Sequence, residues 1–579
     1  MLKIWKKLMI LLDKRQKRQM ILMVPLMLLS AALEMASLLL VMAVITVIAT
    51  PEGIESNKIA SALYNGLNFT GIKSFSIAVM VSLIVAYILK NVYLFFQWKI
   101  QYAFVYRNQF MTSEKMLRSY LNRDYEYFLF ADTAVVQRSI TSDVNNMYGL
   151  ILSILTIVSE LFVSLTLVIY LFVVDPVMCL VIGALLLITM FAITKILKPV
   201  MKKSGQENQD FYAGLFKWIS QIVQGIKELK VSRKERYFVN EYKKCGTGYV
   251  NAVERYSLYN NTPKLLIETV CVTGMIGFFI YTILNGQDVS SKLSVIGGFA
   301  YAAIKLMPSA NKINNQLNAI SYFEPFLMNV SDKLQDYISD SKTDITYLSE
   351  DVERLDIKKG IYLKNIKYRY PQTERYILDN ASMDVPIGCS VGIVGSSGAG
   401  KTTVVDILLG LLKPEAGGVY ADETNTNDEY RSWLKNVGYI PQMIYMIDGS
   451  IRQNVAFGVS DEDIDEKRVW ECLEEAQLAD YIKSLPEGLD TQIGERGVRI
   501  SGGQRQRIGI ARALYNDPEV LILDEATSAL DNDTEAAIME SVNALHGKKT
   551  LIIIAHRLQT IEKCDMVYRI ENGRITRER

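Results

Sequence analysis

Six long apolar runs in the first half of the chain constrain its fold more than any other feature. An α-helix needs about 20 residues to cross the roughly 30 Å hydrocarbon layer of a bilayer. The last run is the weakest, because Lys305, Pro308 and Asn311 interrupt it. The runs lie near residues 20–50, 74–98, 147–174, 176–197, 265–284 and 293–313. The first half is therefore predicted to be an all-α membrane domain with six spans.

Basic residues are concentrated in three segments that alternate with the apolar runs. They crowd the N-terminal stretch "KIWKKLMILLDKRQKRQM" and the connections that follow the second and fourth runs. By the positive-inside rule these segments, and with six spans both chain termini, are predicted to be cytoplasmic. The first run is too long for a signal peptide and lacks a small-residue cleavage site, so it is predicted to be an anchor.

The connections between the apolar runs differ in length. The two basic connections are long and helical in pattern, which predicts that runs two to five continue beyond the bilayer, with cytoplasmic tips near residues 125–131 and 211–218. The outer connections are short except for residues 51–73. There apolar residues recur every four positions from Ile59 to Leu67, which fits either an amphipathic helix on the outer surface or a solvated loop.

Several ionisable residues lie inside the predicted spans. Each costs about 2.5–3.5 kcal/mol on insertion scales, so such residues usually face a cavity or a partner. They are Glu34, Lys90, Glu160, Lys195, Glu268 and Lys305. We expect a water-filled cavity at Glu34 and Glu160, whereas Lys90 and Lys195 are expected to snorkel or to lie beyond the hydrocarbon. Lys305, beside "MPSAN", is the predicted contact for an anionic substrate.

Length, charge and composition exclude several classes of protein. A chain of 579 residues is too long for one core, so two or more domains are expected. The formal net charge of +1 gives no support to a nucleic-acid-binding surface. The six cysteines form no CxxC pair and only two histidines are present, which argues against a zinc site or a disulfide scaffold.

The second half has a different pattern from the first. Residues 331–356 are polar and charged without a long apolar period, which predicts a linker between a transmembrane domain, 1–330, and a second domain, 357–579. Beyond the linker, short β-type runs alternate with helical patterns, as in an α/β nucleotide-binding domain.

The clearest motif of the second domain is "SVGIVGSSGAGKTTVVDILLGLL", an apolar strand, a G-x-x-x-x-G-K-T loop and a helix. Glycines in such a loop let backbone N–H groups surround phosphates, while Lys401 reaches the β- and γ-phosphates of ATP and the Thr402 hydroxyl binds Mg²⁺. The predicted ATP-binding residues of this loop are Gly395, Ser396, Ser397, Gly398, Ala399, Gly400, Lys401, Thr402 and Thr403.

Two further motifs carry polar residues at the ends of structural elements. In "VLILDEATSALD" an apolar strand ends in two acids, so Asp524 is predicted to hold Mg²⁺ and Glu525 to polarise the attacking water. The alternative is that these acids merely cap the following helix. "RISGGQRQRIGIARAL" opens a helix with polar and basic residues, and the free N–H groups and positive dipole end of such a helix suit a phosphate.

In this order, the phosphate loop, "SGGQ", "LDEATSALD" and "IIIAHR" resemble the ATP-binding-cassette (ABC) family. With six spans in front, essentially the whole chain resembles an ABC exporter half-transporter, which implies a six-helix transmembrane domain fused to an α/β P-loop domain. ABC cassettes pair head to tail, so the resemblance implies that Ser501, Gly502, Gly503 and Gln504 cover ATP held by the other subunit. Ile500 replaces the usual leading Leu, a conservative departure.

The same resemblance implies roles for single residues. Tyr370 in "YRYP" matches the aromatic that stacks on adenine, and Gln442 in "YIPQ" matches the glutamine that senses Mg²⁺ and water. Asp531 matches an acidic residue that communicates across the dimer, and His556 matches the switch histidine at the γ-phosphate, whereas His546 is expected to be an ordinary surface residue. The predicted catalytic residues are Glu525, His556 and Gln442, and the predicted Mg²⁺ ligands are Thr402, Gln442 and Asp524.

The resemblance also implies a function. Glu525 and His556 are both intact, so a homodimer with two competent sites is predicted, with a heterodimer as the alternative. Fusion of the spans to the cassette implies export across a bacterial inner membrane, in contact with membrane lipid and not with nucleic acid. The stretch "IKLMPSANKINNQLNAI" resembles bacterial flippases, which predicts ATP-driven translocation of a polyprenyl-diphosphate-linked oligosaccharide to the outer leaflet. Export of peptides, lipids or drugs is the alternative.

Overall fold

The computed structural model describes residues 2–49, 72–174, 176–284, 293–339, 352–494, 497–525, 538–540, 542–555 and 561–579. The chain divides into two compact units. The helical unit comprises Met1–Arg123 and Ala131–Tyr347, and the α/β unit comprises Asp124–Phe130 and Leu348–Arg579.

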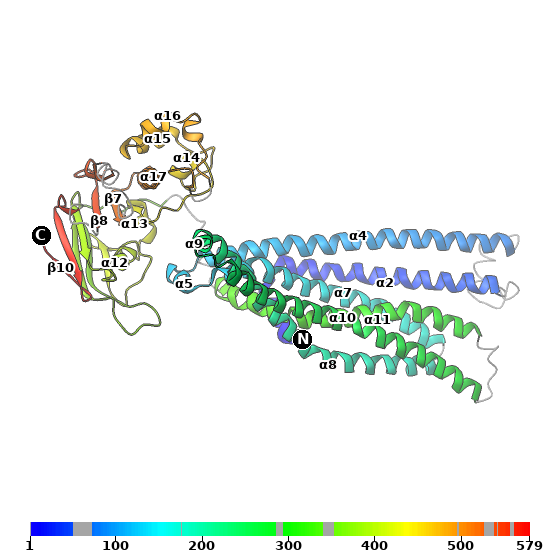
Figure 1. Ribbon diagram of the computed structural model, residues 1–579. Helices are drawn as coiled ribbons and strands as arrows, with labels where there is room; N and C mark the ends of the chain where they lie inside the picture. The colour runs from blue at the N-terminus through cyan, green and yellow to red at the C-terminus, as the bar shows by residue number, and fades with distance from the viewer. Residues whose placement is uncertain are drawn as a thin grey trace. The chain divides into compact units, whose positions relative to one another are not determined.

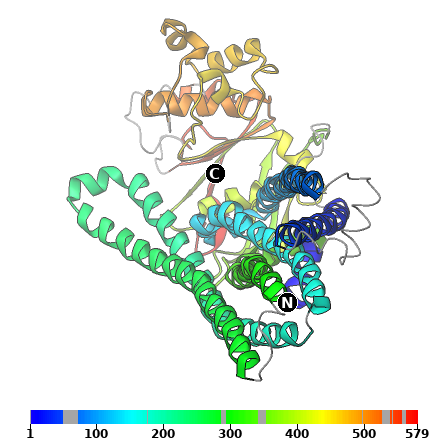
Figure 2. The same ribbon diagram turned by 90° about the vertical axis from the view of Figure 1, so that its right-hand side faces the viewer.

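Long helices that run side by side build the helical unit (Figures 1 and 2). The long helices are α2 (Lys14–Ala49), α4 (Ile72–Leu121), α7 (Val144–Val174), α8 (Pro176–Gln224), α10 (Glu235–Leu284) and α11 (Leu293–Ser339). Three short helices, α1 (Leu2–Leu11), α6 (Thr133–Arg138) and α9 (Ile226–Ser232), belong to the same unit. A π-helix, Ser139–Asp143, joins α6 to α7. Helices of about 50 residues are far longer than a bilayer requires, as the sequence predicts for runs two to five.

Four stretches of the described residues are long and apolar enough to cross a membrane, judged by length and composition. They are Lys14–Val41, Ser74–Leu121, Thr133–Val173 and Cys179–Gln224. The fifth and sixth predicted runs lie on α10 and α11, which are continuous helices there, but many of their side chains fall outside the described part. The predicted outer segment, residues 51–73, also lies outside it, apart from the first two residues of α4.

Close packing of α8 on α11 depends on a glycine. A Cβ atom at Gly205 would lie 2.0 Å from the backbone oxygen of Tyr322, so only glycine allows this approach. The Tyr322 ring stacks on Tyr256 of α10 with centroids 4.0 Å apart, which ties three helices together. The buried Met201 and Phe326 complete this cluster.

Two sequence expectations about helix ends are corrected. Residues 211–218 lie within α8 rather than at a tip, because their aromatic side chains pack on α10, where Trp218 contacts Tyr237 and Phe238 edge-on. The helix instead breaks at Gly225, before α9. The predicted linker begins too early, because α11 continues to Ser339 with Leu334 buried at 2% exposure.

Two sheets form the core of the α/β unit. Strands β1 (Gly360–Tyr368), β2 (Leu378–Pro386), β4 (Ala416–Ala421) and β5 (Thr424–Asn425) make an antiparallel sheet of order β2-β1-β4-β5. The second sheet has the order β10-β9-β3-β8-β7-β6, formed by β3 (Ser390–Gly395), β6 (Val437–Ile440), β7 (Val520–Asp524), β8 (Thr550–Ile554), β9 (Met566–Glu571) and β10 (Arg574–Arg577). All of its pairings are parallel except that of β9 with β10.

Short helices complete the α/β unit. They are α5 (Tyr125–Phe130), α12 (Lys401–Leu408), α13 (Tyr430–Asn436), α14 (Ile451–Val455), α15 (Glu466–Glu475), α16 (Ala479–Ser484) and α17 (Gly502–Tyr515). Every residue of β7 and β8 is buried, as expected for parallel strands covered on both faces. Helix α5 matches the predicted tip near residues 125–131, and its Glu126 carboxylate accepts a 2.9 Å hydrogen bond from the Tyr368 hydroxyl.

Candidate ATP site and membrane cavity

Four neighbouring parallel strands end at one edge of the six-stranded sheet. In spatial order they are β3, β8, β7 and β6. Ligands of open α/β sheets bind at the carboxyl ends of the strands, so the segments that follow these strands are the ones that can form a site. The phosphate loop follows β3, Glu525 follows β7 and Gln442 follows β6. The sheet therefore assembles motifs that are far apart in the sequence.

The phosphate loop ends at Gly400, the N-cap of α12. Gly400 has φ of 102°, a left-handed conformation that glycine adopts without steric cost. The Lys401 side chain is 5% exposed, and its Nζ donates to the carbonyl oxygens of Gly395 and Ser396 at 3.1 and 3.3 Å. The ammonium group therefore lies against the loop, while Thr402 in the next position is exposed.

The two carboxylates after β7 have different surroundings. Asp524 is the last residue of the strand and is 5% exposed. Glu525 has φ of 48°, and its backbone N–H donates to the Ile554 oxygen of β8 at 3.1 Å. Its carboxylate accepts a hydrogen bond from Gln442 Nε2 at 2.9 Å and lies 3.8 Å from Lys401 Nζ. A left-handed residue that is not glycine is strained, and such strain is typical of functional sites.

The residues predicted to bind Mg²⁺ supply the oxygen donors that this hard cation prefers. Thr402 contributes a hydroxyl, Asp524 a carboxylate and Gln442 an amide oxygen, all from the same sheet edge. Among the described residues, no group of three or more His, Cys, Asp or Glu side chains could hold a metal by itself. Mg²⁺ commonly uses one or two carboxylates and takes its remaining ligands from phosphates and water, so this donor set fits the ion.

Asp406 is a buried carboxyl that sequence reasoning missed. It lies on α12 and is 8% exposed. Burial, with a contribution from the nearby charge of Asp524, raises the pKa of Asp406 to about 6. Neighbouring carboxylates resist simultaneous ionisation, so a cation held at Asp524 would favour the charged form of Asp406. The signal was present in the sequence, as an acid within the apolar stretch "VVDILL".

Tyr370 lies beside the phosphate loop. Its hydroxyl forms a 3.1 Å hydrogen bond with the Thr403 hydroxyl, and its ring meets Tyr368 edge-on with centroids 5.3 Å apart. Tyr368 in turn donates to Glu126 of α5. Tyr370 is thus adjacent to the predicted nucleotide site, as its predicted role requires.

The "SGGQ" segment forms the start of α17. Ser501 is the N-cap, its Oγ accepts from the Gln504 N–H at 3.2 Å, and Gln504 Oε1 accepts from the Ser501 N–H at 2.8 Å. This reciprocal pair is a capping box, which the S-x-x-Q spacing could have revealed. No hydrogen bond or ion pair joins Ser501 to the phosphate loop in the described part of this single chain.

Helix α17 is fixed to the segment that follows Gln442. A Cβ atom at Gly509 would lie 2.5 Å from Ile444 Cδ1, so glycine is needed for the close approach. Arg512 donates to the backbone oxygens of Asn454 and Tyr445, both at 2.7 Å. Burial lowers the pKa of Arg512 to about 10, which leaves it charged at neutral pH.

A cavity of about 810 Å³ lies among α2, α4, α7, α10 and α11 of the helical unit. Glu34 and Glu160 line it, as the sequence predicts. Glu160 accepts from Ser309 and Lys312, both at 2.7 Å. Glu34 pairs with Lys90 at 2.9 Å. The expectation that Lys90 snorkels is wrong, because Lys90 is 4% exposed and reaches this carboxylate on the neighbouring helix.

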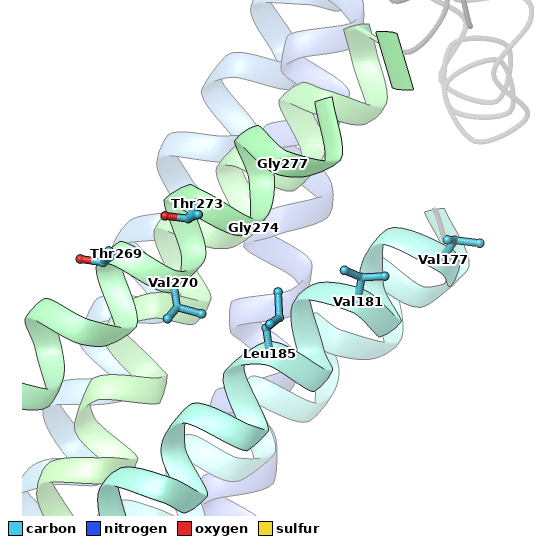
Figure 3. Close-up of a pocket in the computed structure, with 8 residues that line it drawn as sticks. All are labelled: Val177, Val181, Leu185, Thr269, Val270, Thr273, Gly274 and Gly277. Atoms are coloured by element: carbon cyan, nitrogen blue, oxygen red, sulfur yellow. The ribbon is translucent and has the colours of Figure 1, made fainter. Parts of the chain in front are cut away.

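Lys195 and Glu268 are exposed, and the side chain of Lys305 lies outside the described part. A separate apolar groove of about 790 Å³ runs between α8 and α10. Figure 3 shows Val181 and Leu185 of α8 facing α10, where Gly274 and Gly277 leave room. None of the described residues that line the groove has a titratable side chain.

Comparison with known proteins gives a consistent result. The family described as "ABC transporter transmembrane region" matches residues 20–284, and the family described as "ABC transporter" matches residues 378–528. The chain belongs to the ABC transporters. Membership makes it a membrane protein and an ATPase that couples ATP hydrolysis to transport.

Individual proteins resemble this ABC transporter over different lengths. An "ATP-dependent lipid A-core flippase" of Cupriavidus pinatubonensis is 27% identical over 78% of this chain and 75% of its own. The "Heterocyst differentiation ATP-binding protein HepA" of Nostoc sp. is 32% identical over 62% of this chain and 57% of its own. The structure of a bacterial Atm1-family ABC exporter with ATP bound superposes with a TM-score of 0.74, at 21% identity over 97% of this chain and 95% of the other.

The described residues of the ABC transporter include most of the predicted ATP site. Lys401, Thr402, Gln442, Asp524 and Glu525 come together at the sheet edge. Asp531 and His556 lie outside the described residues.

His546 is an exposed surface residue, as expected, and it also contacts a carboxylate. Its Nε2 lies 2.9 Å from Asp565 Oδ2. The Ser390 backbone N–H also donates to Asp565 at 2.7 Å, and these hydrogen bonds lower the pKa of Asp565 to about 2. The Asp565 carboxylate therefore ties the start of β3 to the residue that precedes β9.

Proposed function

We propose that this protein is an ATP-driven flippase that moves a lipid-linked oligosaccharide from the cytoplasmic to the outer leaflet of a bacterial inner membrane, with both termini cytoplasmic. The observation that carries the proposal is the match to lipid A-core flippases along both the membrane region and the cassette. These relatives are named as ATP-dependent flippases of lipid A-core, and lipid flipping is the kind of transport that the proposal requires. Export of peptides, lipids or drugs is the second candidate.

The proposed hydrolysis uses the residues gathered at the sheet edge. Lys401 binds the β- and γ-phosphates, Thr402 and Asp524 hold Mg²⁺, and Glu525 orients and polarises water for attack on the γ-phosphate. Gln442, already bonded to Glu525, senses the occupancy of the site. Mg²⁺ supplies charge neutralisation on the phosphate oxygens when it is bound.

The proposed active species is a homodimer. Ser501 begins a capped helix whose first N–H groups form an anion-binding end, yet within the described part of its own chain no hydrogen bond joins it to the phosphate loop. A second copy, paired head to tail, would bring this helix to the phosphates. Light scattering in detergent should then give a mass near twice the 65.5 kDa of one chain.

The test is ATPase activity of the purified protein in proteoliposomes, with the Glu525→Gln variant as the hydrolysis-deficient control. Polyprenyl-diphosphate oligosaccharides extracted from bacterial membranes are compared with a panel of peptides and drugs. Stimulation and ATP-dependent translocation of the oligosaccharide lipid support the flippase function. Stimulation by peptides or drugs, without any response to the lipid, would instead leave a general exporter.

A further inference from the structure

The cavity among α2, α4, α7, α10 and α11 has a lining suited to hydrogen bonding. Gln97 lines it, is 2% exposed, and its Oε1 accepts no hydrogen bond among the described residues. Asn260 Oδ1, on the facing helix α10, is likewise buried without a described donor. A buried acceptor without a donor costs about 1–3 kcal/mol, so both oxygens favour a ligand that donates hydrogen bonds.

The charges around the cavity compensate one another. Glu160 is paired with Lys312, and Glu34 is paired with Lys90. In the described lining, every ammonium group is already bound to a carboxylate. An anion would therefore find no unpaired positive charge there. A diphosphate placed here would be desolvated beside two carboxylates, which is unfavourable in surroundings of low polarity. The cavity is built for a polar group without net charge.

Aromatic rings add a second kind of contact. Trp98 and Tyr102 lie one turn apart on α4, line the cavity, and are 52% and 46% exposed. One face of a sugar ring presents C–H groups that pack well on an aromatic face, while the hydroxyls at its edge remain free to bond to amides and carboxylates. A ligand that carries many hydroxyl donors and such apolar faces matches both features of the lining.

We propose that this cavity binds the uncharged glycan of the transported lipid, and that the anionic group of the lipid is held elsewhere. Gln97 and Asn260 accept hydrogen bonds from sugar hydroxyls, and Trp98 and Tyr102 pack on sugar rings. The proposal rests on the proposed flippase function and names the part of the substrate that the cavity recognises.

Stimulation of ATP hydrolysis in nanodiscs tests the proposal, with three probes applied to the full-length protein. The probes are polyprenyl-diphosphate oligosaccharides, the same polyprenyl diphosphate without sugar, and the free oligosaccharide released by mild acid as a competitor. The wild type should respond to the glycosylated lipid and be inhibited by the free oligosaccharide. Asn260→Ala and Tyr102→Leu should raise the half-stimulating concentration of the glycosylated lipid at least fivefold.

Neighbouring residues outside the lining provide matched controls. Asn261→Ala and Tyr106→Leu change the same residue types on the same helices, and they should leave the response unchanged. Thermal unfolding of each variant separates loss of binding from loss of folding. Equal stimulation by the sugar-free lipid, or cavity variants that match their controls, would overturn glycan recognition while leaving the flippase function intact. Response to peptides or drugs alone would overturn both.

Discussion

Gln442 Nε2 donates to Glu525 Oε2 at 2.9 Å, and this bond connects the segments that follow β6 and β7. The other carboxylate oxygen of Glu525 faces Lys401 Nζ at 3.8 Å. Gln442 and Lys401, which are predicted to contact Mg²⁺ and phosphate, are therefore both engaged with the proposed catalytic carboxylate. We expect the phosphate oxygens of bound ATP to compete with Glu525 for the Lys401 ammonium group.

This arrangement predicts the effect of Glu525→Gln. The amide keeps the size of the side chain but cannot accept a proton from water, so the ATPase rate should fall by a factor of about 10²–10⁴. ATP binding should persist, because Lys401 and the phosphate loop are unchanged. Phosphate release and binding of a fluorescent ATP analogue measure the two effects. Glu571→Gln, on β9, is the matched control, and a Glu525→Gln variant that keeps a third of the rate would exclude the assigned role.

Tyr370 should act through its ring rather than its hydroxyl. The proposed partner of the ring is adenine, whereas the hydroxyl only bonds to Thr403. Tyr370→Phe should therefore change ATP affinity less than threefold. Tyr370→Ala should weaken it about tenfold, because an aromatic stack contributes about 0.5–1.5 kcal/mol beyond the area that it buries. Titration with a fluorescent nucleotide distinguishes the variants, and equal losses in both would assign the effect to the hydroxyl.

The residues of the ATP site could be predicted because short sequence motifs specify them. The apolar strand before Gly395 and the strand before Asp524 each specify where a side chain or loop emerges, and parallel pairing then places both at one sheet edge. The capping role of Gln504 could also have been predicted from the local S-x-x-Q spacing. The two glycines of this segment instead favoured an interpretation as phosphate binding alone.

Contacts between distant helices could not be predicted. Lys90 and Glu34 lie on separate helices, and nothing in either run specifies which faces meet, so solvation of the lysine was the simpler expectation. The predicted tip near residues 211–218 was placed too early for a related reason. The half-buried Trp218 packs edge-on against Tyr237 and Phe238 of α10, and the sequence of α8 alone does not specify that contact.

Asp406 predicts a pH dependence of stability in the absence of nucleotide and Mg²⁺. Its pKa is raised to about 6 in the folded chain, so the folded state holds the proton more tightly than the unfolded state. The free energy of unfolding is then highest below about pH 4, falls as pH rises toward 6, and is constant above it, with a total change of about 3 kcal/mol.

Asp406→Asn removes this titration. The variant should be more stable than the wild type at pH 7 and should lack the decline between pH 4 and 6. Thermal unfolding of the full chain with EDTA, at pH values from 4.5 to 7.5, measures the difference. Asp379→Asn, an exposed acid on β2, is the control. Parallel pH curves for wild type and Asp406→Asn would contradict the raised pKa.

The Lys90–Glu34 pair should behave as a unit. Lys90→Met leaves the Glu34 carboxylate without this partner inside the helical unit, and breaking a buried pair costs about 3–5 kcal/mol. Lys90→Met combined with Glu34→Gln removes both charges, so much of the lost stability should return. Thermal unfolding in a single detergent, for the two single variants and the double variant, gives the coupling energy directly. If the losses of stability in the two single variants add up to the loss in the double variant, the two residues are not coupled. The stability of the cavity wall would then not depend on the Lys90–Glu34 pair.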